Sequence, residues 1–236
     1  MCRSTCLWAL RHERTILDSH GPLPMTQPSA TCPNCGAKIV FRWSSSVQTV
    51  CAYCQSVLVR TDVDLKKIGR ISDLPPDSSP IQVNTEGLYR NRSFVVIGRI
   101  LYAYENGGWN EWHLMMNTGE NGWLSDAQSE YAVSFAVPGH KLPSSSQQVK
   151  VGQRFTWDAR TYMVSSITRA HYKGVEGELP FEYWDKDEVM FVDLRSETGG
   201  FATLDYSDDE PALYVGELVD FADLQLKNLR AFEGWS

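Results

Sequence analysis

Two Cys-x-x-Cys pairs near the beginning of the chain limit what this sequence can fold into. Cys32 and Cys35 form the first pair, Cys51 and Cys54 form the second, and fifteen residues separate the two pairs. The first pair continues as Cys-Pro-x-Cys-Gly, a tight turn in which Gly36 provides the freedom for a positive φ. Four thiolates that converge from two such turns satisfy the tetrahedral coordination of Zn²⁺. The spacing therefore predicts one structural zinc ion bound by these four cysteines.

The predicted zinc site is closed, because four protein ligands leave no coordination position for a substrate. The free energy of metal binding would fold a module that is otherwise too small to bury a core. Short β-type segments surround the cysteines, so residues 31–60 are predicted to form a zinc ribbon. Rubredoxin-type iron, two local redox pairs and coincidence are the competing interpretations. A redox role is the weakest of them, because the βαβ pattern that accompanies a redox Cys-x-x-Cys is absent from the sequence.

The residues before the predicted ribbon differ from it in pattern. Residues 1–24 show no clean period of 2 or 3.6, and we expect residues 1–30 to be a disordered leader. The simplest interpretation is that translation starts at Met25. The competing interpretation is that Cys2 and Cys6, which lie in this leader, supply further thiolates.

Residues 61–80 are predicted to be a linker between the ribbon and the rest of the chain. Leu65, Ile68 and Ile71 give a short stretch of helical spacing within it. The sequence LPPDSSP then ends this stretch, because each proline lacks a backbone donor and restricts the residue before it.

The composition is that of a soluble globular protein, with 42% hydrophobic and 22% charged residues. No apolar run approaches the roughly 20 residues that span a bilayer, and the first residues of the chain lack the apolar core of a signal peptide. We therefore expect a cytoplasmic protein without a transmembrane segment. In a reducing cytoplasm, paired cysteines indicate metal ligands before structural disulfides.

Charge is distributed unevenly along the chain. Residues 1–80 carry nine Lys/Arg and six Asp/Glu, a net charge of +3, whereas residues 81–236 carry thirteen and twenty-three, a net charge of −10; together they give −7. The acidic body opposes contact with a phosphate backbone, so nucleic acid would have to bind to the ribbon alone.

The remainder of the chain contains an internal repeat. Four short segments rich in Val, Tyr, Phe, Trp and Thr follow one another in the same order in residues 81–140 and in residues 150–236. The first segments lie 68 residues apart and the third segments 78 residues apart, so the second copy has an insertion, which is acidic. This strand-and-turn pattern predicts a mostly all-β fold with little helix. We expect a small N-terminal zinc ribbon followed by two tandem antiparallel β-barrel or β-sandwich-like repeats.

Three stretches carry a resemblance to a known family: SPIQVNTEGLYRNRSFVVIGRI, GGWNEWHLMMNTGENGWLSDAQ and VEGELPFEYWD. With them the chain resembles the bacterial family named domain of unknown function 4178, over most of residues 30–236. The resemblance implies tandem copies of the domain behind a cysteine knuckle module. It implies little about activity, because the family is uncharacterised.

Strand alternation in GWNEWHLMM separates two faces. One face carries Trp112, Leu114 and Met116, which we expect to lie in the core. The opposite face carries the candidate ligand-binding residues, which are Trp109, Glu111 and His113. Aromatic rings beside a carboxylate suit a cationic ligand through cation–π attraction. The competing interpretation is that the tryptophans fill the core and that His113 is an ordinary strand residue.

The acidic insertion of residues 176–188 is the second candidate site. Glu176 and Glu178 lie between glycines and a proline, which indicates a shaped loop. Two carboxylates held close together can perform acid–base chemistry, and they can also bind a hard cation or a cationic partner. The competing interpretation is a solvated run of charge.

Enzyme signatures are missing from the sequence, which has no His-Glu-x-x-His, Gly-x-Ser-x-Gly, Walker or dinucleotide-binding motif. We therefore expect a non-catalytic zinc-binding protein that interacts with a protein partner or a cationic ligand. The second hypothesis is an enzyme, or an enzyme accessory subunit, that uses the carboxylates of residues 176–188. The third is a nucleic-acid binder that uses the basic ribbon.

Overall fold

A computed structural model describes residues 27–60, 65–70, 79–182 and 188–231. The predicted leader lies almost entirely outside these residues, and so do Met25, Cys2 and Cys6. The described residues are mostly β-strand, which confirms the all-β prediction. Their helices are two short 3-10 turns, η1 (Ser146–Gln148) and η2 (Phe221–Leu224). In this described part of the chain, no helix has the length and apolar character needed to cross a membrane.

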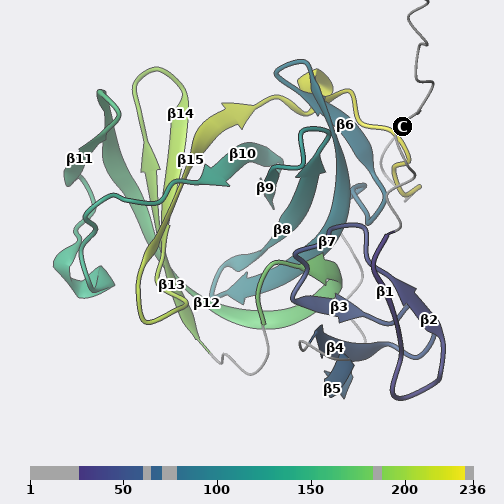
Figure 1. Ribbon diagram of the computed structural model, residues 1–236. Helices are drawn as coiled ribbons and strands as arrows, with labels where there is room; N and C mark the ends of the chain where they lie inside the picture. The colour runs from purple at the N-terminus through teal and green to yellow at the C-terminus, as the bar shows by residue number, and fades with distance from the viewer. Residues whose placement is uncertain (1–26, 61–64, 71–78, 183–187, 232–236) are drawn as a thin grey trace, which may run out of the picture.

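Eight antiparallel strands form a closed barrel (Figure 1). The strands are β7 (Arg92–Tyr104), β8 (Gly107–Met116), β9 (Asn121–Ala127), β10 (Glu130–Ala136), β12 (Arg160–Leu179), β13 (Val189–Arg195), β14 (Gly200–Asp205) and β15 (Ala212–Val219). Two meanders, β7 to β10 and β12 to β15, supply four strands each. The ring closes because β7 pairs with β12 and β10 pairs with β15.

The two halves of this barrel are built alike. Each meander is preceded by a short strand that pairs with its first long strand: β6 (Glu86–Tyr89) with β7, and β11 (Arg154–Trp157) with β12. The order of strands is thus the same in both halves. The hydrogen bonds between the halves join them in one continuous sheet, so each half completes the other.

Two apolar clusters lie on the face of the sheet opposite to the barrel interior, and a third includes side chains of the interior, such as Ile100, Tyr102 and Phe191. In β8, Trp112, Leu114 and Met116 are buried in one cluster with Leu224 of η2. Their neighbours Trp109 and Glu111 line the interior instead. The predicted core face of β8 is therefore confirmed. A second cluster on the other half of the barrel contains side chains of β11 to β15.

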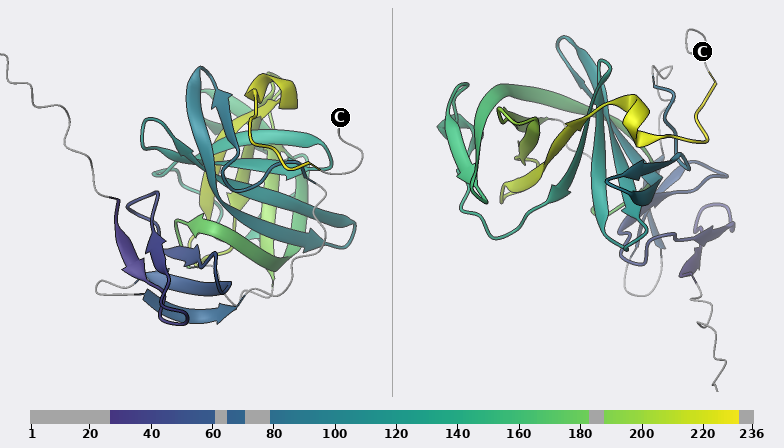
Figure 2. Two further views of the ribbon diagram at one scale, coloured as in Figure 1. Left: turned by 90° about the vertical axis from the view of Figure 1, so that its right-hand side faces the viewer. Right: turned by 90° about the horizontal axis from the view of Figure 1, so that it is seen from above.

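The N-terminal part of the chain forms a cysteine module, which we define as the described residues between 27 and 70. Its strands are β1 (Ser29–Thr31), β2 (Lys38–Val40), β3 (Gln48–Val50), β4 (Ser56–Arg60) and β5 (Leu65–Arg70). Strand β3 pairs with the end of β12, so the module is joined to the barrel sheet and packs beside it (Figure 2).

Strand β5 lies where the sequence showed helical spacing in a linker. It pairs with β4 from Arg60↔Leu65 to Ser56↔Arg70. A helix of so few residues is marginal in water, whereas the edge of β4 offers a full set of backbone partners. This part of the chain extends the sheet of the cysteine module.

Candidate functional site

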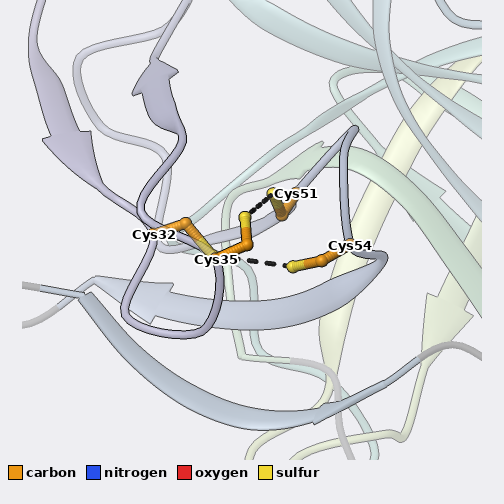
Figure 3. A group of neighbouring side chains, drawn as sticks. All are labelled: Cys32, Cys35, Cys51 and Cys54. Carbon is orange, nitrogen blue, oxygen red and sulfur yellow. Dashed lines mark hydrogen bonds between the residues drawn. The ribbon is translucent and has the colours of Figure 1, made fainter.

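The structure brings the four cysteines together (Figure 3). Their sulfur atoms lie within 4.8 Å of one another, and the Cys32–Cys54 and Cys35–Cys51 sulfur distances are both 3.7 Å. A tetrahedral site with metal–sulfur bonds of about 2.3 Å places its sulfurs about 3.8 Å apart. A disulfide would bring two sulfurs to about 2.05 Å. The thiols are therefore arranged as ligands of one metal ion and are not disulfide-bonded.

Two equivalent turns present these cysteines. In the first turn, the Gly36 N–H donates to the Cys32 carbonyl at 2.9 Å. In the second, the Gln55 N–H donates to the Cys51 carbonyl at the same distance. Gly36 has a φ of 76° and Gln55 a φ of 57°. Gln55 therefore adopts the left-handed conformation that glycine adopts at low cost.

Two of the four thiols have pKa values that are shifted in opposite directions. Hydrogen bonding to Ser56 lowers the pKa of Cys54 to about 5. The Ala37 backbone favours the Cys35 thiolate, but desolvation and the neighbouring sulfurs outweigh this and raise the pKa of Cys35 to about 12. A divalent cation would stabilise the thiolate form of the cysteines, because cysteines bind metals as thiolates.

Glu178 joins the cysteine module to the barrel. Its carboxylate accepts hydrogen bonds from the backbone N–H groups of Arg42 and Trp43, at 2.8 and 3.2 Å, and from the Ser46 hydroxyl. Its backbone pairs with Thr49 of β3. Glu178 is 6% exposed. This residue is a buried contact between two parts of the structure, not a surface carboxylate.

His113 lies at the same junction. Its Nδ1 is 2.8 Å from the Glu178 carbonyl oxygen, and its Nε2 is 3.3 Å from the Asn121 amide nitrogen. The Trp43 ring meets the imidazole edge-on, with centroids 5.3 Å apart. Burial lowers the pKa of His113 to about 4, so the ring is neutral. His113 thus supports the junction, and it is not among the described residues that line the cavity with Trp109 and Glu111.

The barrel interior contains a cavity of about 340 Å³. All eight barrel strands contribute to its lining, and so does Phe181. Besides Glu111, the described lining includes eight serine, threonine or acidic side chains that sequence reasoning did not connect: Ser125, Glu130, Ser134, Ser166, Thr168, Asp193, Thr203 and Asp205. Trp109 and Glu111, two of the predicted ligand-binding residues, also line it.

Three aromatic rings, from Tyr102, Trp109 and Phe191, form one part of the lining, which we call the aromatic wall. Tyr102 and Trp109 stack with ring centroids 4.9 Å apart. Phe191 meets both rings edge-on, at 5.0 and 5.5 Å. These three residues come from β7, β8 and β13, so strand pairing brings together rings that are distant in the sequence.

Acidic groups occupy other parts of the lining. The Glu111 carboxylate accepts hydrogen bonds from the Trp109 indole at 2.9 Å and from the Ser125 hydroxyl at 2.9 Å. Desolvation raises the pKa of Glu111 to about 8, and the charges of Asp193 and Asp205 add to this effect. Burial also raises the pKa of Asp193. The one basic residue of the described lining is Arg195, which forms an ion pair with Glu130.

The structure places the carboxylates of the acidic insertion in different surroundings. Glu176 lies 3.4 Å from the Arg99 guanidinium and is about one-third exposed, at 32%. Glu178 is buried at the junction, and Glu188 forms an ion pair with Arg169 at 3.2 Å. Residues 183–187 lie outside the described residues. The carboxylates that are described therefore do not form one site.

Alternation along β13 is the signal that could have identified part of the cavity. Phe191, Asp193 and Arg195 alternate with Val192 and Leu194, which are buried in the apolar cluster on the opposite face. A polar face opposite a fully buried apolar face indicates a wet interior.

Comparison with known proteins gives one match. The family model described as Domain of unknown function (DUF4178) matches residues 82–221. This range contains both halves of the barrel. No curated protein and no solved structure matches the chain.

Proposed function

The chain belongs to the DUF4178 family of domains of unknown function, and we propose that it is a non-catalytic binding protein whose barrel cavity holds a small ligand. The cysteine module, in this proposal, is a zinc ribbon with one structural Zn²⁺. The observation that carries the proposal is the cavity itself, which all eight strands enclose. Its volume of about 340 Å³ lies within the roughly 300–1,000 Å³ that ligand pockets occupy.

The composition of the lining supports ligand binding over a structural role. An eight-stranded barrel is just wide enough for side chains to fill it or for one small ligand to bind. The barrel lining has small residues at Ser125, Ala132 and Ser134, where larger apolar side chains would close the space. Two apolar clusters lie on the other face of the sheet, and a third includes lining residues such as Tyr102, Trp109 and Phe191. We propose that a ligand occupies the space that these side chains leave.

The ligand set supports zinc. Four cysteine sulfurs at tetrahedral spacing suit Zn²⁺, and a site with four protein ligands has no position for a reacting water. We assign the ion a structural role: it fixes the two turns, and the segment between them supplies the donors that bind Glu178. Free thiols of this kind persist in a reducing compartment, which supports a cytoplasmic location.

Metal analysis of the purified protein tests the zinc assignment. We expect one zinc ion per chain, which Cys32→Ser and Cys51→Ser should each abolish. Cys2→Ser and Cys6→Ser are the matched controls and should leave the zinc content unchanged. Iron as the bound metal, with the visible absorption of an iron–thiolate centre, would refute zinc. Loss of metal in the control variants would instead support further thiolate ligands.

Native mass spectrometry of the protein from its own host tests ligand binding. We expect a small molecule of fixed mass bound to one chain. Ala132→Phe places a ring in the cavity and should remove this mass, whereas Ala136→Phe, at an exposed position of the same strand, should retain it. Circular dichroism establishes that both variants fold. The proposal fails if the unmodified chain carries no such molecule.

A further inference from the structure

We propose that the ligand of the barrel cavity is an organic cation, with its charged group held between the aromatic wall and the carboxylates of Glu111 and Asp193. The inference rests on the proposed binding function and names the chemical class of the ligand. Its basis is the juxtaposition of the three rings of Tyr102, Trp109 and Phe191 with acidic side chains in one enclosed space.

The described lining is rich in acidic groups. It contains four carboxyl groups, from Glu111, Glu130, Asp193 and Asp205, and the single guanidinium of Arg195. Glu130 and Arg195 bind each other, and their side chains are 56% and 31% exposed, so this ion pair lies where the cavity meets solvent. Farther inside, the described lining contains no lysine and no histidine. A cationic ligand would therefore meet acidic groups and aromatic rings in the described part of the lining.

Uncharged donors hold the inner carboxylates in place. Glu111 binds the Trp109 indole and the Ser125 hydroxyl, and Asp193 binds the Ser166 hydroxyl at 3.1 Å. These donors orient the two carboxyl groups, and the charge of Arg195 also acts on Asp193. Inside the barrel a negative charge is less well solvated than in bulk water, so it is costly by itself and attracts a cation more strongly. Desolvation likewise raises the pKa of Glu111 to about 8, so this group is protonated near neutral pH without a ligand, and a bound cation would favour its carboxylate form.

The aromatic wall distinguishes an organic cation from a metal ion. A hard cation such as Ca²⁺ needs six to eight oxygen ligands that converge on one point. Among the described residues, the four cysteines are the one group of three or more potential ligands close enough to share a metal ion. The cavity carboxylates are thus too far apart for a metal site. Tyrosine and tryptophan faces instead attract an ammonium group through the cation–π interaction.

Trp109 connects the two parts of the site. Its ring stacks on Tyr102, and its indole N–H donates to Glu111. A cation against this ring would lie close to the Glu111 carboxylate as well. The cation–π and ion-pair interactions would therefore act on the same charged group. A neutral ligand of the same shape would make neither interaction.

Calorimetric titration of the zinc-loaded full chain with charge variants of one shape tests the proposal. The probes are choline, its neutral isostere 3,3-dimethylbutan-1-ol and the anion 3,3-dimethylbutanoate. We expect choline to bind at least tenfold more tightly than the neutral isostere, and the anion not to bind.

Variants locate the bound probe. Glu111→Gln keeps the acceptor oxygen for Trp109 and Ser125, and it should weaken choline binding at least tenfold; Asp193→Asn should weaken it in the same direction. Glu120→Gln removes the same charge at an exposed ion pair with Arg92 and should bind choline like the unmodified chain. Equal weakening by Glu120→Gln would overturn the proposed location.

The outcomes distinguish the cation inference from the proposed binding function. If the neutral isostere binds as tightly as choline, or if the anion binds best, the cation inference is refuted and the binding function stands. If none of the three probes binds and the native chain carries no small molecule, the binding function falls as well. If choline binds Glu111→Gln as tightly as the unmodified chain, the assignment of Glu111 is wrong.

Discussion

Replacing Glu178 tests the junction between the cysteine module and the barrel. Its carboxylate receives three hydrogen bonds, from the N–H groups of Arg42 and Trp43 and from the Ser46 hydroxyl. Glu178→Ala removes the acceptor and leaves these donors without it at a buried site. The matched control is Glu176→Gln, because Glu176 lies two residues away on the same strand and is one-third exposed.

The expected magnitude follows from the three donors. A buried donor that loses its acceptor costs about 1–3 kcal/mol. Arg42 is exposed, so water can reach part of the site, and we expect Glu178→Ala to destabilise the docked module by about 3–5 kcal/mol. Glu176→Gln weakens a partly solvated ion pair and should cost less than about 1 kcal/mol.

Hydrogen exchange measures this effect at the two backbone donors themselves. The amides of Arg42 and Trp43 should be protected in the unmodified chain. They should exchange at least a hundredfold faster in Glu178→Ala, because about 1.4 kcal/mol corresponds to a factor of ten. Amides of the pair β9 and β10 report on the barrel and should change less. Unchanged protection of Arg42 and Trp43 in Glu178→Ala, or an equal loss in Glu176→Gln, would refute the reasoning.

Three further predictions concern the metal turns, the cavity and the barrel seam. Gln55→Gly should raise the free energy of unfolding by about 1 kcal/mol in chemical denaturation, because Gln55 has a φ of 57°, and Gly36→Ala should lower it by about 1–2 kcal/mol. Glu111 keeps its proton in the folded chain up to about pH 8 while the unfolded chain releases it near pH 4.3, so stability should fall by up to about 1.4 kcal/mol per pH unit between these values. Glu111→Gln should reduce this slope, and an unchanged slope would contradict the assignment. Gly98→Ala should lower the free energy of unfolding by more than about 3 kcal/mol, because the added Cβ would lie 2.0 Å from the Glu178 carbonyl oxygen. A decrease no larger than that of Gly36→Ala would show that the pairing of β7 with β12 adapts to the added Cβ.

Local features of the fold could be predicted from the sequence. The spacing of the cysteines predicted their convergence, because short turns fix the geometry of each pair. The alternation in β8 predicted that Trp112 and Glu111 face opposite ways. The order of the segments predicted two halves with the same sequence of strands. Each of these inferences depends on residues that are close together in the chain.

Closure of the barrel could not be predicted in the same way. The seams pair Gly98 with Gly177 and Tyr131 with Val219, which are 79 and 88 residues apart. Periodicity shows which face of a strand is apolar, but it does not show which strand is its neighbour. For this reason the sequence suggested two consecutive β units, and the shared interior with its acidic and aromatic lining was not anticipated.

Glu176 and Glu178 show the same limit at the level of single residues. Both are glutamates beside glycine, and the sequence placed them in one acidic site. In the structure, Glu178 is covered by the cysteine module, whereas Glu176 faces Arg99. The difference depends on a segment more than a hundred residues earlier in the chain.

The pairing of β3 with β12 also has a consequence for how the protein behaves when metal is scarce. Strand β3 covers the backbone of Glu178 and Leu179, and Val57 of the module packs into an apolar cluster with Leu179. If the module unfolds after loss of its metal, this strand edge and this cluster become exposed together. An exposed apolar strand edge is a template for pairing with another chain. Chains without the proposed metal ion would then associate at this edge more readily than metal-loaded chains.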